Sequence, residues 1–212
     1  KNDTQTLSIH ILDEDDTTTS HALSLVAYPS NAGTLVGAGI YPSGTQAAIS
    51  ATPADGHSFT EWSGDGITDA NALDTTVSMT QDRNVTASFA INRHTLIVAS
   101  GTGSGEFDWN STVPIIANAT TGYTFTGWTG AGITNPGDAN ATVLMTEDRN
   151  VTATFQINSY SLIVSANGEG GAVSASAAHD YGTQATITAT PQTGYSFIGW
   201  TGDGIADLNA AT

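Results

Sequence analysis

The chain repeats one phrase three times, and this repetition limits the possible folds more than any other feature of the sequence. The copies occupy residues 56–67, 122–133 and 194–205, and each joins a glycine, a phenylalanine and a tryptophan to a Gly-x-Gly-Ile ending. A second phrase, residues 79–89, returns almost unchanged as residues 145–155. An internal repeat of this kind is typical of tandem structural units built from the same elements. The sequence therefore predicts a tandem-repeat protein.

The repeats divide the chain into four segments. We expect residues 1–20 to be the end strand of an upstream domain followed by an acidic linker. Residues 21–91 and 92–157 are expected to be complete repeat units, and residues 158–212 a third unit truncated before its last two strands. Units this small bury only about 60% of their unfolded surface, so contact between neighbouring units should add stability.

Short alternating segments indicate that each unit consists of β-strands. Residues 45–52 alternate apolar and polar side chains, as do the matching residues 111–118 and 183–190. Residues 85–89 and 151–155 place valine, alanine and phenylalanine on one face and threonine or serine on the other. This period of two is typical of half-buried strands, and no window has the spacing of an amphipathic helix. The predicted fold is mainly β, with tandem small antiparallel β-sheet units arranged as beads on a string.

The aromatic residues of the repeated phrases are candidate core anchors, because large aromatic side chains dominate the cores of small domains. A continuous strand would place Phe59 and Trp62 on opposite faces, so burying both requires a β-bulge, for which Gly127 and Gly199 are suited in the later copies. The alternative is a row of exposed tryptophans that stacks on sugar rings. The expected structural residues are Trp62, Trp128, Trp200, Phe59, Phe125, Phe197, Phe89 and Phe155.

The charge of the chain excludes several kinds of partner. Twenty acidic residues against four lysines and arginines give a formal charge of −16. Such a surface repels nucleic acid and anionic membranes and attracts divalent cations. No apolar stretch is long enough to span a bilayer, so we expect no membrane insertion. The sequence has no cysteine, which excludes disulfides and thiolate metal sites.

Four consecutive acidic residues form the main candidate metal site. Ca²⁺ takes oxygen ligands, and Asp13, Glu14, Asp15 and Asp16 could supply several of them. The alternative is a solvated acidic linker, because further ligands would have to come from elsewhere in the chain. No motif requires a cofactor, and calcium is the candidate ion.

Trp109 stands outside the repeated phrases, in the segment Phe107-Asp-Trp-Asn. Loops vary in sequence and often carry function, so Trp109 is a candidate ligand-binding aromatic residue. No nucleophile, base or acid stands in a recognisable catalytic pairing. We therefore expect that the protein is not an enzyme.

The motifs of the units follow a fixed order: an opening hydrophobic strand, a Gly-rich turn, Ala-Thr-Pro, Gly-Tyr-x-Phe-x-Gly-Trp-x-Gly, and Asn-Val-Thr-Ala-Thr-Phe. Over residues 21–212 this order resembles the divergent internalin-type B repeats of bacterial surface and secreted proteins. The resemblance implies compact β-grasp-like units that serve as spacers, stalks or interaction modules in long extracellular chains, without catalytic residues. Separately, residues 6–16 are similar to the terminal strand and acidic tail of Calx-beta domains, whose acidic residues bind calcium.

These observations favour a non-catalytic spacer or stalk in a large extracellular bacterial surface or adhesin-like protein, whose partners are other domains of the same chain. One alternative is a carbohydrate-binding or substrate-targeting module of a secreted polysaccharide-degrading enzyme, with a surface polysaccharide as partner. A second is a subunit of a surface fibre that assembles by strand addition. In that case the strand at residues 6–12 of one subunit would complete the third unit of another.

Overall fold

The computed structural model describes residues 19–211, which form only β-strands and their connections. Repeats 1, 2 and 3 denote the three sequence repeats at residues 21–91, 92–157 and 158–212. Contacts instead divide the chain into two compact units, unit 1 and unit 2. Unit 1 runs to His94 and also includes Asp108–Asn110, whereas unit 2 consists of Thr95–Phe107 and the residues from Ser111 onward. Residues 19–211 contain no helix long and apolar enough to cross a membrane.

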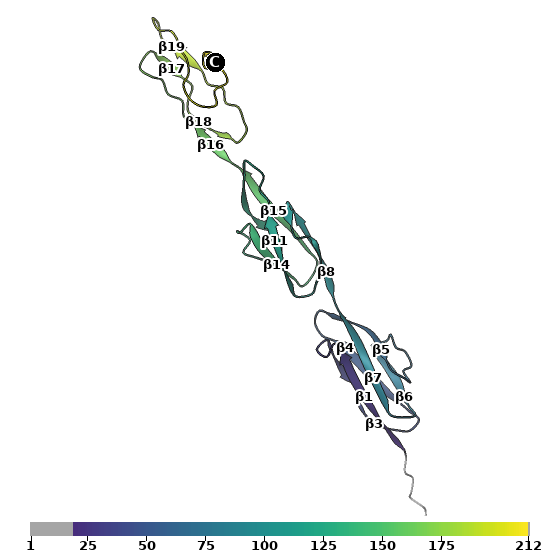
Figure 1. Ribbon diagram of the computed structural model, residues 1–212. Coiled ribbons are helices and arrows are strands. Elements are labelled where there is room, and N and C mark those ends of the chain that lie inside the picture. Colours follow the sequence, from purple (N-terminus) through teal and green to yellow (C-terminus); the bar gives the residue numbers. More distant parts are fainter. Residues whose placement is uncertain (1–18, 212) are drawn as a thin grey trace, which may run out of the picture. The chain divides into compact units, whose positions relative to one another are not determined.

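Repeat 1 consists of seven strands in two sheets (Figure 1). One sheet has the order β3-β1-β7-β5 and the other the order β2-β4-β6. The strands are β1 (Ser20–Tyr28), β2 (Gly33–Val36), β3 (Gly39–Pro42), β4 (Thr45–Pro53), β5 (His57–Ser63), β6 (Asp74–Met79) and β7 (Arg83–Ile91). The mainly β fold in small separate sheets is therefore confirmed.

The first and last strands of repeat 1 lie side by side and run parallel, whereas its other strand pairs are antiparallel. The β1–β7 register runs from Leu23 opposite Arg83 to Tyr28 opposite Ser88. Parallel neighbours need a long connection, and β2 to β6 provide it. Side chains alternate in the same way in parallel and antiparallel strands, so the sequence pattern does not predict this pair.

Both sheets of repeat 1 contribute alternate side chains to one core. The fully buried Val85 and Ala87 of β7 belong to the same cluster as Ala47 and Ile49 of β4. These residues point inward because successive side chains of a strand face opposite sides. The faces predicted from the alternation are therefore the faces observed.

Repeat 2 has the same architecture. Its sheets have the orders β10-β8-β15-β12 and β13-β14-β11-β9, and β8 runs parallel to β15. The strands are β8 (Arg93–Ala99), β9 (Gly101–Thr102), β10 (Gly105–Asp108), β11 (Ser111–Ala117), β12 (Tyr123–Thr129), β13 (Ile133–Thr134), β14 (Asn140–Met145) and β15 (Arg149–Ile157). Its core cluster again draws on both sheets.

The described part of repeat 3 contains two sheets of two strands each, β16-β18 and β17-β19. The strands are β16 (Ser159–Leu162), β17 (Gly171–Val173), β18 (Ala177–Asp180) and β19 (Ala189–Pro191). Of the strand expected at residues 183–190, only the last two residues are in strand conformation. In repeat 1 the equivalent strand, β4, pairs with β6 from Thr45 opposite Met79 to Ser50 opposite Asp74.

The bulge expected before the repeated tryptophan is present. The pairing of β5 with β7 shifts register between Phe59 and Glu61, and that of β12 with β15 shifts between Phe125 and Gly127. The extra residue brings phenylalanine and tryptophan to the same face of the sheet. In repeat 1 the ring centroids of Phe59 and Trp62 are 5.7 Å apart.

Candidate functional site

The repeated tryptophans anchor loops to the cores. Trp62 and Trp128 are 2% and 5% exposed, whereas Trp200 is half-buried. The indole N–H groups donate to carbonyl oxygens ten residues downstream, over distances of 3.0 to 3.1 Å, at Ala72, Asp138 and Ala210 respectively. A buried ring whose N–H group is already bonded leaves no face for a sugar, so the first two tryptophans form no exposed row.

The phenylalanines complete these aromatic clusters. Phe89 is 6% exposed and the other members are half-buried; Phe59, Phe125 and Phe155 pack against the core clusters. Ring centroid distances of 5.3 to 5.9 Å link each phenylalanine of the phrase to its tryptophan and, in the first two repeats, to a phenylalanine of the last strand. The residues concerned are Phe59, Phe125, Phe197, Phe89 and Phe155.

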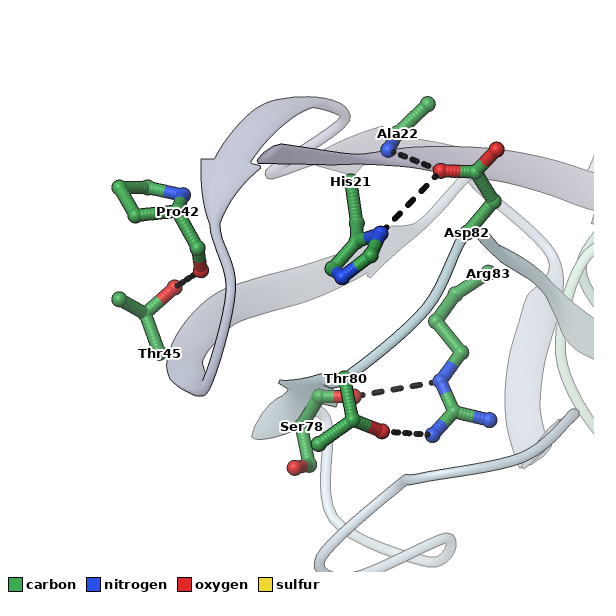
Figure 2. A network of polar contacts seen from close by, with 8 residues as sticks. All are labelled: His21, Ala22, Pro42, Thr45, Ser78, Thr80, Asp82 and Arg83. Atoms are coloured by element: carbon green, nitrogen blue, oxygen red, sulfur yellow. Dashed lines mark hydrogen bonds and ion pairs between the residues drawn. The ribbon is translucent and has the colours of Figure 1, made fainter. Parts of the chain in front are cut away.

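An aspartate just before the last strand holds the first strand of each complete repeat. Asp82 Oδ1 accepts a hydrogen bond from the backbone N–H of Ala22 at 2.8 Å and lies 3.7 Å from Nδ1 of His21 (Figure 2). In repeat 2 Asp148 accepts from the backbone N–H of Thr95, also at 2.8 Å. In each complete repeat the carboxylate thus links the residue before the last strand to the first strand of the repeat.

Replacing Asp82 with alanine should lower the free energy of unfolding of repeat 1 by about 1 kcal/mol, because the Ala22 N–H group loses its acceptor. Asp82→Asn keeps an oxygen at this position and should cost less. Urea denaturation followed by circular dichroism measures both. An equal loss for the two variants would show that the negative charge near His21, rather than the acceptor, carries the effect.

An arginine next to this aspartate fixes the turn before β7. Arg83 donates from Nε to the carbonyl oxygen of Ser78 at 3.2 Å and from its terminal nitrogen to Oγ1 of Thr80 at 3.0 Å (Figure 2). Its side chain is 11% exposed, and it lies 4.0 Å from a carboxylate oxygen of Asp65. Asp82 and Arg83, adjacent in the sequence, each bond to other residues of repeat 1.

The acidic partner of this arginine differs between the repeats. In repeat 2 Arg149 pairs with Glu147 at 2.6 Å. Ala131 stands where repeat 1 has its aspartate, and Gln81 stands in repeat 1 where repeat 2 has Glu147. One acidic neighbour has thus replaced the other, which indicates a local structural role for the arginine and not a shared ligand site.

Trp109 follows β10 of repeat 2 but belongs to unit 1. Its backbone N–H donates to the carbonyl oxygen of Asn92 at 2.8 Å. Its half-buried indole lies against Gly56, where an added Cβ would overlap the ring. Beside it, Nε of Arg93 is 3.4 Å from a carboxylate oxygen of Asp108. The candidate ligand-binding tryptophan therefore contacts the chain itself.

Tyr181 makes the equivalent contacts within unit 2. Its backbone N–H donates to the carbonyl oxygen of Asn158 at 2.7 Å, and its ring lies over Gly122. The repeated phrases do not reveal this correspondence, because Trp109 and Tyr181 lie outside them. Alignment of Asp108-Trp109 with Asp180-Tyr181 is the signal that reveals it.

The candidate calcium ligands Asp13, Glu14, Asp15 and Asp16 lie outside the described residues. Between residues 19 and 211 no group of three or more histidines and acidic residues could hold a metal ion. The calcium site at 13–16 therefore stays a prediction.

Two surface hollows offer no catalytic arrangement. One lies beside Val36, Ile49 and Asp74 in repeat 1, and the other beside Ser100 and Tyr123 in repeat 2. Neither lining includes a histidine, lysine or arginine.

Comparison with known proteins supports the motif order. A family model described as the divergent InlB B-repeat domain matches residues 23–93, 95–159 and 160–212. No curated protein and no solved structure matches the chain. The first two matches each cover almost all of a complete two-sheet repeat, and the third covers the described part of repeat 3. The chain therefore belongs to the divergent InlB B-repeat family.

Proposed function

We propose that this chain is a non-catalytic spacer segment that separates other domains of an extracellular bacterial surface protein. The B-repeat family suggests a repeat module of the bacterial surface, and such repeat domains are generally non-catalytic. The spacer role is supported by what the side chains do. The repeated aromatic residues and the arginines bind within their own repeats.

The observation that carries the proposal is the length of the junctions. A single residue, Asn92, separates β7 from β8, and a single residue, Asn158, separates β15 from β16. The backbone N–H of Asn92 donates to Gly56 at 2.8 Å, and that of Asn158 donates to Gly122 at 2.8 Å. A junction of one hydrogen-bonded residue has few conformations compared with a flexible linker. Short ordered junctions suit a segment that fixes distance.

Small-angle scattering can test the spacer role on the chain and on a variant that lacks residues 92–157. The deletion joins Ile91 to Asn158, so one asparagine still connects two repeats. The nine residues of β15 extend over about 30 Å, at roughly 3.3 Å per residue. We expect the maximum dimension to fall by about that length. Equal maximum dimensions for the two proteins would contradict the proposal.

A binding assay separates the spacer from the carbohydrate-binding alternative. The chain is passed over insoluble polysaccharides, with Trp109→Ala as the matched variant. A spacer is expected to show no retention. Retention that is lost in the Trp109 variant would instead support a targeting module.

A further inference from the structure

The turn that carries Trp109 belongs to repeat 2 by sequence and to unit 1 by its contacts. Its indole covers Gly56, which has a φ of +72°. Any side chain at this position would collide with the ring, because an added Cβ would overlap its atoms. The glycine is therefore needed for the close approach of the aromatic ring as well as for its backbone conformation.

Asn92 joins the two sides of this contact. Its backbone N–H donates to the carbonyl oxygen of Gly56 at 2.8 Å, and its own carbonyl oxygen accepts from Trp109 at 2.8 Å. Its side-chain oxygen accepts from Oγ of Ser58 at 2.5 Å. We call these four residues, Gly56, Ser58, Asn92 and Trp109, the junction clamp.

A second clamp with the same bonds occurs inside unit 2. Asn158 donates to Gly122 at 2.8 Å and accepts from the backbone of Tyr181 at 2.7 Å. Its side-chain oxygen accepts from Oγ1 of Thr124 at 2.6 Å. The hydroxyl donor is serine in the first clamp and threonine in the second, and the aromatic residue is tryptophan in the first and tyrosine in the second. Each position thus keeps its hydroxyl group or its aromatic ring while the residue changes.

Repeat 1 has a serine, Ser43, at the position of the aromatic residue. In repeat 1 the equivalent backbone bond runs from Ser43 to the carbonyl oxygen of Thr19, at 2.7 Å. Gly194, the equivalent glycine of repeat 3, has a φ of +88° and no atom within 4 Å of an added Cβ. The two aromatic residues at this position, Trp109 and Tyr181, each lie over a glycine of the preceding repeat.

We infer that the turn at Gly56 or Gly122 is a docking surface for the turn of the following repeat, which carries Trp109 or Tyr181. This docking couples the unfolding of neighbouring repeats. Neighbour contacts contribute much of the stability of small repeat units. An aromatic ring that packs on a glycine buries apolar surface at little entropic cost. The coupling does not depend on whether the chain serves as a spacer.

A double-mutant cycle between Gly56 and Trp109 tests the inference in the whole chain, with amide hydrogen exchange as the readout. Trp109→Ser introduces the residue that stands at the equivalent position of repeat 1. We expect the amide of Asn92 to exchange about tenfold faster or more, because the clamp opens locally. The amide protection factors of β7 and of β8 should then fall at different urea concentrations, whereas in the original chain they should fall together.

The second arm of the cycle isolates the ring contact. Gly56→Ala should accelerate exchange at Asn92 strongly in the original chain and only slightly in the Trp109→Ser background. Gly44→Ala is the control, because Gly44 has a φ of +80° and no atom within 4 Å of an added Cβ. It reports the backbone strain alone.

Trp109→Tyr provides a variant that should keep the fold, since Tyr181 occupies the second clamp. It should retain slow exchange at Asn92 and coupled protection of the two strands. An unchanged Asn92 rate in Trp109→Ser, or an equal effect of Gly56→Ala in both backgrounds, would overturn the inference. Uncoupled protection in Trp109→Tyr would also count against it.

Discussion

Replacing Trp62 with alanine is expected to lower the free energy of unfolding of repeat 1 by about 4 kcal/mol. The indole is 2% exposed and packs against Phe59 at a centroid distance of 5.7 Å. Its removal leaves a cavity in the core and frees the carbonyl oxygen of Ala72, which accepts from the indole N–H at 3.0 Å. A loss of this size is comparable to the whole stability of a small domain, so repeat 1 should unfold at room temperature or close to it.

Trp200→Ala is the matched control for this prediction. Trp200 makes the same bond, to Ala210 at 3.0 Å, but it is only half-buried. Its removal exposes less new surface and should cost clearly less. Urea denaturation monitored by circular dichroism, with hydrogen exchange to assign the transition to a repeat, measures both losses. Equal losses in the two variants would contradict the buried-anchor explanation.

Gly64→Ala should also be strongly destabilising, with an expected cost of roughly 3 kcal/mol. Gly64 follows the repeated tryptophan and has a φ of +133°. An added Cβ would lie 2.6 Å from the carbonyl oxygen of Asn84 and 3.2 Å from Cγ2 of Val85. The crowded oxygen belongs to the backbone, so it cannot move away as a flexible side chain could.

The third copy of the phrase again supplies the control. Gly202 has a φ of +140°, and its added Cβ would meet nothing closer than Cδ1 of Ile205 at 3.6 Å. Gly202→Ala therefore carries backbone strain without crowding, and the difference between the two variants isolates the crowding. Gly130→Ala should behave like Gly64→Ala, because its Cβ would lie 2.6 Å from the carbonyl oxygen of Asn150. Thermal unfolding of the three variants tests the order, and a Gly202 variant as unstable as the Gly64 variant would contradict it.

Short-range patterns were sufficient to predict β4, β7, β11 and β15 and their inward faces, whereas β2 and β3 lie where a Gly-rich turn was expected. Val85, Ala87 and Phe89 alternate with polar residues, and the alternation itself marks the buried face. The bulge between Phe59 and Trp62 was also predictable, because only an extra residue lets both rings share one side.

Long-range pairing was not predictable in the same way. The parallel β1–β7 pair joins strands at opposite ends of a repeat, and the side-chain pattern of a strand does not specify the direction of its neighbour. The position of Trp109 depends on the same kind of information. Its contact with Gly56 joins residues that are far apart in the sequence. The sequence around a loop tryptophan does not distinguish a ring that packs on a distant residue from a ring that is exposed to solvent.

The parallel pairing of β1 with β7 also determines how a repeat would respond to tension. Because both strands point the same way, the chain enters a repeat at one end of the pair and leaves at the other. A pull on the two connections would therefore slide the strands along each other, and would load the hydrogen bonds from the Leu23–Arg83 register to the Tyr28–Ser88 register together. Strands in this shear geometry resist force more strongly than strands that peel apart one bond at a time. The β1–β7 pairing thus places the hydrogen bonds of the pair at right angles to a pull on the two ends of the repeat.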